Sequence, residues 1–235
     1  MITEEQFREE ALAFLATKNV RMLYALAGMF GLSLADHWPL MVLSTPCLLL
    51  LLGIAQMAVA APIAYEIDPN HTHPMFEADH LDGLSTWRAI FRKTTGSVIL
   101  DASASQGSVD ILIDMSSVDF GHDKLNDIAV NSAAPPIFEA AKYPVAHYQG
   151  TLEQFVGGSP HAVVGRLTMH GVTRPVTLHI DSFKCMINPL TKREVCGAEA
   201  SADLDRSEFG ITVGKPYGFR MNVHLRIQVE AIRAD

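Results

Sequence analysis

The stretch Asn222 to Ala231 reads NVHLRIQVEA and alternates polar and apolar side chains without a break. Successive side chains of a β-strand point to opposite faces, so this period of two predicts a strand with one apolar and one polar face. The apolar face consists of Val223, Leu225, Ile227, Val229 and Ala231. We expect this face to cover the core of the protein.

The same alternation recurs along the chain from Tyr65 onward. About eight such segments follow one another at short spacing, and turn residues such as Gly83, Gly96, Gly107 and Gly171 separate them. Many short strands with one apolar face each predict an all-β fold, either a sandwich or a closed antiparallel barrel.

One region departs from the alternation, between His122 and Ala141. Leu125, Ile128 and Ala129 have helical spacing, and the pair Pro135-Pro136 suits the start of a second short helix. The sequence therefore predicts one or two short helices inserted near residues 122–141. In an otherwise β chain, we expect such helices to cap the mouth of a barrel or to line its entrance.

Three segments are more specific than alternation requires. They are YEIDPNHT at residues 65–72, GRLTMHGVTRPVTLHI at residues 165–180, and DRSEFGI at residues 205–211. Together they resemble the YceI-like family of small exported proteins, over roughly residues 65–231. The resemblance implies a lipocalin-like antiparallel β-barrel of about eight strands. It also implies a binding protein for an isoprenoid or similar long-chain lipid, with no catalysis.

Two of these motifs also have structural interpretations. Asp205 is expected to cap the short turn Arg206 to Gly210 by accepting backbone N–H bonds, with Arg206 in an ion pair at the end of the barrel. Residues 172–175 are expected to connect two strands after Gly171. Pro175 would then open the second strand, where its missing donor matters least.

The capacity to hold a ligand depends on the size of the inward side chains. Ala198, Ala200 and Ala202 share one face of the strand after Cys196, which indicates either space for a ligand or a helix packed closely against the strand. The residues alone leave both interpretations open, and the resemblance favours the cavity. The predicted ligand contacts are Phe76, His80, Trp87, Phe91, Ile113, Met169, Ala198, Ala200 and Leu225.

The N-terminal part of the chain predicts export. Residues 41–60 are nearly free of charge and end in Ala58-Val59-Ala60, the small-x-small pattern that precedes signal-peptidase cleavage. We expect residues 41–60 to be a signal peptide, cleavage between Ala60 and Ala61, and a periplasmic location. An uncleaved anchor is the alternative, because the apolar stretch reaches about 20 residues.

The first forty residues do not fit a signal peptide. They open with an acidic segment, and no Lys or Arg lies between Met22 and Leu52. We interpret residues 1–40 as a non-native N-terminal extension and expect translation to begin downstream, at Met22 or Met41. Residues 61–235 then form a single YceI-like barrel domain.

The cysteines fit an exported protein. Loss of Cys47 with the signal peptide would leave Cys185 and Cys196, which flank a turn containing residues 188–191. Pairing the strands about that turn places the two sulfurs nearly opposite each other. A disulfide is expected in an oxidising compartment, and two free thiols are the alternative.

Histidines near the start of the domain raise the question of a metal site. His71 and His73 would share one face of a strand, and His80 lies close by. No third ligand falls at a recognised spacing, so no metal is predicted. The later histidines are expected on solvated polar faces of their strands; they are His147, His170, His179 and His224.

Charge and motifs exclude other functions. The chain carries a formal net charge of −8, which argues against nucleic acid and against an anionic membrane surface as partners. It contains no Gly-x-Ser-x-Gly and no glycine-rich phosphate loop, so no enzyme is predicted.

Two classes of function remain. The first is an exported protein that holds an isoprenoid, quinone-like or similar long-chain lipid, for carriage or storage, with no other cofactor. The alternative is a structural or stress-protective periplasmic interaction module without a specific ligand. An inner-membrane redox or lipid-pathway protein and a homodimer stay open as further partners.

Overall fold

The computed structural model describes residues 61–131 and 137–234. The predicted extension and signal peptide, including the Ala60 side of the cleavage site, lie outside the described residues. The strands are β1 Ile63–Ile67, β2 His73–His80, β3 Ser85–Phe91, β4 Thr94–Asp101, β5 Gln106–Asp114, β6 Val118–Asp119, β7 Val145–Glu153, β8 Ala162–Met169, β9 Val172–Ile187, β10 Glu194–Asp205 and β11 Asn222–Arg233. The helices are α5 Asp123–Asn131 and the 3₁₀ turns η1 Met115–Ser117, η2 Arg206–Phe209 and η3 Lys215–Tyr217.

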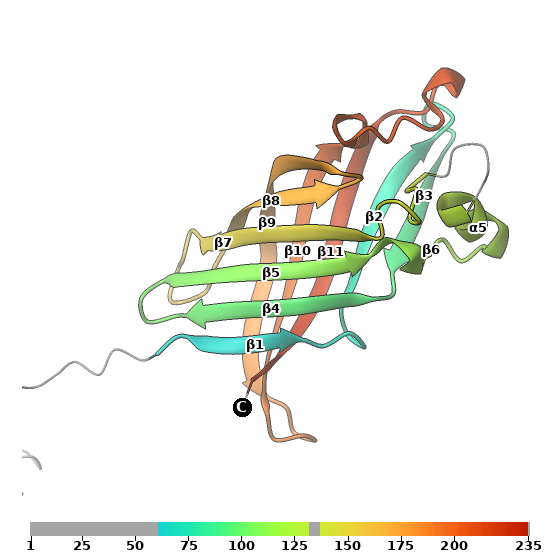
Figure 1. Cartoon of the computed structure of the whole chain (residues 1–235). Coiled ribbons are helices and arrows are strands. Elements are labelled where there is room, and N and C mark those ends of the chain that lie inside the picture. The colour runs from blue at the N-terminus through green and yellow to red at the C-terminus, as the bar shows by residue number, and fades with distance from the viewer. Residues whose placement is uncertain (1–60, 132–136, 235) are drawn as a thin grey trace, which may run out of the picture. The chain divides into compact units, whose positions relative to one another are not determined.

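Eight strands close into an antiparallel barrel. Their order is β1, β4, β5, β7, β8, β9, β10 and β11, and β11 pairs with β1 again. Figure 1 shows β1, β4, β5 and β7 side by side, with β9, β10 and β11 forming the other side of the barrel. The predicted lipocalin-like barrel is confirmed, and the sandwich is excluded.

Two of the long strands of the sheet are interrupted. The edge of β11 pairs with β2 over Val223 to Gln228 and with β1 over Ala231 to Arg233, so β1 and β2 act as one interrupted strand. The next two strands form a second interrupted strand beside this one, because β3 pairs with β2 and β4 pairs with β1. The short strand β6 pairs with β3 at the end of the barrel where α5 lies (Figure 1).

One of the two predicted helices forms in the described residues. Helix α5 occupies Asp123–Asn131 and lies beside β6. The expected start of the second helix, Pro135-Pro136, lies outside the described residues. The chain from Ile137 to Lys142 consists of turns and bends rather than a helix.

The β8–β9 hairpin is tighter than the sequence suggested. Its loop is only His170-Gly171, both with positive φ (54° and 75°), which is the geometry of a two-residue turn that follows the twist of its strands. The predicted connection over residues 172–175 is therefore wrong, because β9 already begins at Val172. Pro175 pairs with Arg166 of β8, and β10 joins β9 only from His179 onward, so its missing N–H costs no ladder bond to β10.

The DRSEFGI motif forms the 3₁₀ turn η2. Asp205 caps it as predicted, because its Oδ1 accepts bonds from the Ser207 N–H at 2.7 Å and from the Ser207 hydroxyl at 2.6 Å. The expected ion pair of Arg206 is not formed within the described chain. Its Nη atoms instead donate to the carbonyls of Ile211 (3.1 Å) and Val213 (2.8 Å), because the side chain turns inward and is buried.

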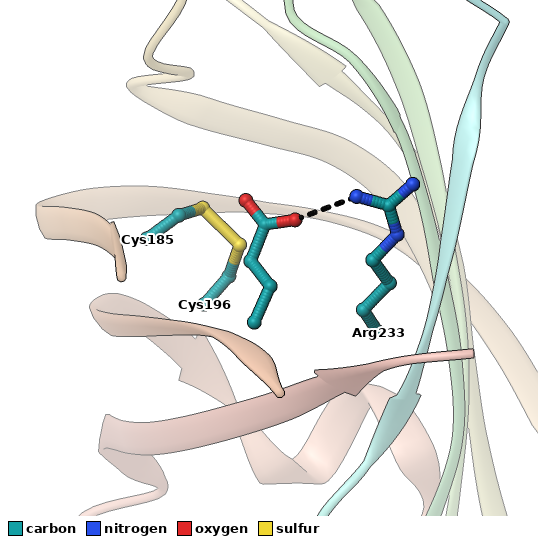
Figure 2. The surroundings of a disulfide bond; sticks show 4 residues. Cys185, Cys196 and Arg233 are labelled. Carbon is teal, nitrogen blue, oxygen red and sulfur yellow. Dashed lines mark hydrogen bonds and ion pairs between the residues drawn. A yellow bond between two sulfur atoms is a disulfide. The ribbon is translucent and has the colours of Figure 1, made fainter. Parts of the chain in front are cut away.

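The predicted disulfide is present. Cys185 of β9 and Cys196 of β10 are directly opposite in the strand register, and their sulfurs are bonded (Figure 2). An ion pair between Glu194 and Arg233, 3.1 Å long, joins β10 to β11 beside it. The disulfide thus fastens the hairpin at one end of the barrel wall.

Replacing both cysteines by alanine should lower the free energy of unfolding by up to about 3 kcal/mol, because the disulfide restricts the unfolded chain. The barrel should still form, since most of its core lies elsewhere. Urea unfolding with and without reductant measures this change. Reductant should destabilise the natural protein by a similar amount and leave the double variant unaffected. Alkylation of both thiols in unreduced, denatured protein would contradict the bond.

Candidate ligand-binding site

The barrel encloses a cavity of about 510 Å³. This volume falls within the usual range for sites that bury a small molecule, about 300–1,000 Å³. Inward residues of every strand that closes the barrel contribute to its wall, including Val223, Leu225, Ile227, Val229 and Ala231 of β11. The apolar face that the alternation predicts for β11 therefore faces this cavity.

All of the predicted ligand contacts lie on the wall of this cavity. They are Phe76, His80, Trp87, Phe91, Ile113, Met169, Ala198, Ala200 and Leu225. Ala202 is buried but does not line the cavity. Helix α5 packs at β6 rather than on the alanines of β10, so the small side chains border open space. Contact of these residues with a ligand stays a prediction.

Four phenylalanines from different elements meet at the wall beside α5. The ring of Phe76 lies 5.9 Å from Phe91, 5.7 Å from Phe120 and 6.0 Å from Phe138, centre to centre. Tilted and edge-on contacts of this kind suit aromatic quadrupoles. Phe120 and Phe138 were missed from the sequence, because both lie outside the strands and have no alternating pattern around them.

A histidine fixes the segment that carries Phe138. The Nδ1 of His170 donates to the Phe209 carbonyl (3.0 Å), and its Nε2 is hydrogen-bonded to Glu139 Oε2 (2.6 Å). Its ring lies 4.4 Å from that of Tyr143. The expectation that His170 is solvated is wrong, since its side chain is only 15% exposed. It belongs to the tight hairpin loop and not to a strand face.

The carboxylate of Asp119 holds β6 and α5 together. Asp119 accepts bonds from the Gly121 N–H (2.7 Å), the Asn126 amide (3.0 Å) and Arg92 Nε (2.6 Å). These bonds, the backbone N–H first, lower the pKa of Asp119 to about 2. Leu125 of α5 lines the cavity, so Asp119 helps to hold this part of the wall.

The Asp119→Asn variant should lose stability at neutral pH, on the order of 1 kcal/mol once solvent screening is allowed for. Because the folded pKa lies below the unfolded one, the natural protein has this contribution above about pH 4 and loses it as the pH falls towards about 2. Urea unfolding of both proteins across this range measures the effect. A constant difference between them at every pH would contradict the assignment to ionised Asp119.

Few polar residues line the cavity, and its acidic and basic side chains gather at one end. In the register, Ala78 of β2 pairs with Val223 of β11, and Val223 pairs with Leu204 of β10. The next lining residues along β2 and after β10 are Asp79, His80 and Arg206, which therefore lie at the same end of the barrel. The ring of His80 lies between those of Trp87 (5.7 Å) and Phe219 (5.0 Å).

The described residues contain neither a cluster of metal ligands nor a membrane-spanning helix. Within residues 61–131 and 137–234, no three His, Cys, Asp or Glu side chains are grouped so that they could hold a metal ion. His71 instead lies 2.7 Å from Asp68 at the surface. No helix in the same part of the chain has the length and apolar character to cross a membrane.

A family model described as the YceI-like domain matches residues 65–231. The chain belongs to the YceI-like family. A UPF0312 protein of Serratia proteamaculans is 31% identical over 181 residues, which cover 77% of this chain and 91% of that protein. A UPF0312 protein of Azotobacter vinelandii is 30% identical over 78% of this chain and 92% of its own length.

Solved structures share the barrel at lower sequence identity. Burkholderia cenocepacia BcnA has a TM-score of 0.53 and 19% identity, over 70% of this chain and 98% of its own. A polyisoprenoid binding domain from Saccharophagus degradans has a TM-score of 0.51 and 16% identity, over 73% and 99%. A Campylobacter jejuni YCEI protein has a TM-score of 0.53 and 18% identity, over 65% and 88%. These likenesses show the fold of this YceI-like chain.

Proposed function

We propose that this YceI-like protein is exported and holds one long-chain amphiphile inside its barrel, for carriage or storage and without catalysis. An isoprenoid or a quinone-like lipid suits the site best. The observation that carries the proposal is the enclosed cavity, whose wall is apolar over most of its length and made of inward residues from all around the barrel. The name of the Saccharophagus degradans neighbour, a polyisoprenoid binding domain, supports the same ligand class.

The energetics favour a long apolar chain. Each methylene group moved from water into an apolar site gains about 0.8 kcal/mol, so a tail of about a dozen carbons offsets the cost of immobilising the molecule. Tilted phenylalanine rings and branched side chains offer such a tail contacts without unmet hydrogen bonds. Ala198 and Ala200 leave room where larger side chains would fill the barrel.

Export through a signal peptide at residues 41–60 is part of the proposal. The Cys185–Cys196 disulfide supports an oxidising compartment such as the periplasm. The mature protein should begin at Ala61, because Ala58 and Ala60 provide the small side chains that processing requires. N-terminal sequencing measures this. An intact N-terminus in the membrane fraction would favour an uncleaved anchor.

Ala200→Phe tests the cavity directly. The larger ring would occupy space on the wall that the tail needs, so lipid extracted from the purified variant should fall to background. Because the ring fills a cavity, the free energy of unfolding should stay the same or rise. In a tightly packed core the same substitution should cost about 1–3 kcal/mol.

Glu199→Phe is the matched control, since Glu199 is the exposed neighbour on the same strand. It adds an identical ring outside the barrel and should leave the bound lipid unchanged. Native mass spectrometry and solvent extraction of all three proteins, produced in their own host, give the result. Natural protein without extractable lipid, together with a strongly destabilised Ala200→Phe variant, would favour a structural or stress-protective module instead.

A further inference from the structure

Arg206 is an unusual residue to find on an apolar cavity wall. Its side chain is only 9% exposed, and its two Nη atoms are used by the carbonyls of Ile211 and Val213. The remaining donor, Nε, is buried and has no hydrogen-bond partner among the described residues. A buried N–H without an acceptor is costly. Because Arg206 lines the cavity, an oxygen atom of a bound ligand would accept the hydrogen bond of Nε.

The charges around this end of the cavity are balanced. Asp79 and Asp205 both act electrostatically on Arg206. Arg220 binds Asp82 through Nε at 2.9 Å and donates its backbone N–H to Asp79 at 3.0 Å, and Lys215 acts on Asp205. The three basic side chains at this end are thus balanced by three carboxylates. Asp79 lines the same end of the cavity as Arg206, so its negative charge would repel an anionic head group bound there.

Aromatic rings enclose the same end. His80 lies between Trp87 and Phe219, and all three residues line the cavity. Tyr217 also lines it and is 76% exposed, so this end of the cavity lies close to solvent. A lipid whose polar end lies here can extend its tail along the apolar wall towards Ala198 and Ala200.

We propose that the end of the cavity formed by Asp79, His80, Trp87, Arg206 and Phe219 is a head-group site that selects an uncharged, oxygen-bearing head group. A carbonyl-type oxygen accepts the hydrogen bond of Arg206 Nε, and Asp79 disfavours phosphates. This inference rests on the proposed lipid-binding function and adds to it the class and position of the head group.

Three probes with one twenty-carbon isoprenoid tail test the selection: the hydrocarbon, the methyl ketone and the monophosphate. Competition between them for the purified chain, followed by native mass spectrometry, gives their relative affinities. The ketone should bind about tenfold more tightly than the hydrocarbon, which is the effect of one hydrogen bond from a charged donor. It should also bind more tightly than the phosphate.

Asp79→Asn should reverse the discrimination against charge. The amide oxygen can still accept the Arg220 N–H, while Arg206 loses a counter-charge, so the affinity for the phosphate relative to the ketone should rise about tenfold. Asp101→Asn is the matched control. Asp101 also accepts a backbone N–H, from Ala104, but it does not line this cavity, so the ratio should not change.

The Arg206→Met variant tests the hydrogen bond from Arg206 to the head group. It should remove the preference for the ketone over the hydrocarbon while the hydrocarbon still binds. Arg206→Met also loses the hydrogen bonds to the carbonyls of Ile211 and Val213. If this loss unfolds the variant, the expected gain of phosphate binding in Asp79→Asn is the remaining test. Equal affinity for all three probes, or an unchanged ratio in Asp79→Asn, would overturn the head-group site and leave lipid binding standing. Failure of every probe to bind would overturn the proposed function and this inference together.

Discussion

Closure of the barrel by the pairing of β11 with β1 is the constraint on which the rest of the structure depends. Tyr65 pairs with Arg233 and Ile67 with Ala231, so the first and last strands of the domain protect each other's edges. Closure gives every strand one inward face and fixes how much space those faces share. Where inward residues are as small as Ala198 and Ala200, the shared space remains as a cavity.

Two regions outside the long strands help to shape the cavity: β6 with α5, and the segment that carries Phe138. Asp119 fixes β6 to α5, and His170 holds Glu139 and thereby the segment with Phe138. Both regions add aromatic or apolar residues to the wall from outside the regular strands. A barrel of the same strands with a different insertion would keep its fold and change the shape of its cavity.

The motifs that mark the family are mainly structural in this chain. His170-Gly171 forms a tight loop with positive φ at both residues, and Tyr143 packs so close that a Cβ on Gly171 would lie 2.8 Å from its ring. Asp205 caps η2, which places the buried guanidinium of Arg206 at the cavity. Local turn chemistry thus places the guanidinium of Arg206 on a mainly apolar wall.

The sequence by itself determined the strands, the inward faces of residues such as Phe76 and Leu225, the helix near residue 123 and the facing cysteines. Each of these follows from alternation, helical spacing or pairing about a turn, which are properties of neighbouring residues. Only the tertiary structure decided the barrel's closure, the partial burial of His170 and the inward turn of Arg206. Those features depend on contacts between segments far apart in the chain, such as His170 with Glu139 and Phe209, and no local pattern records them.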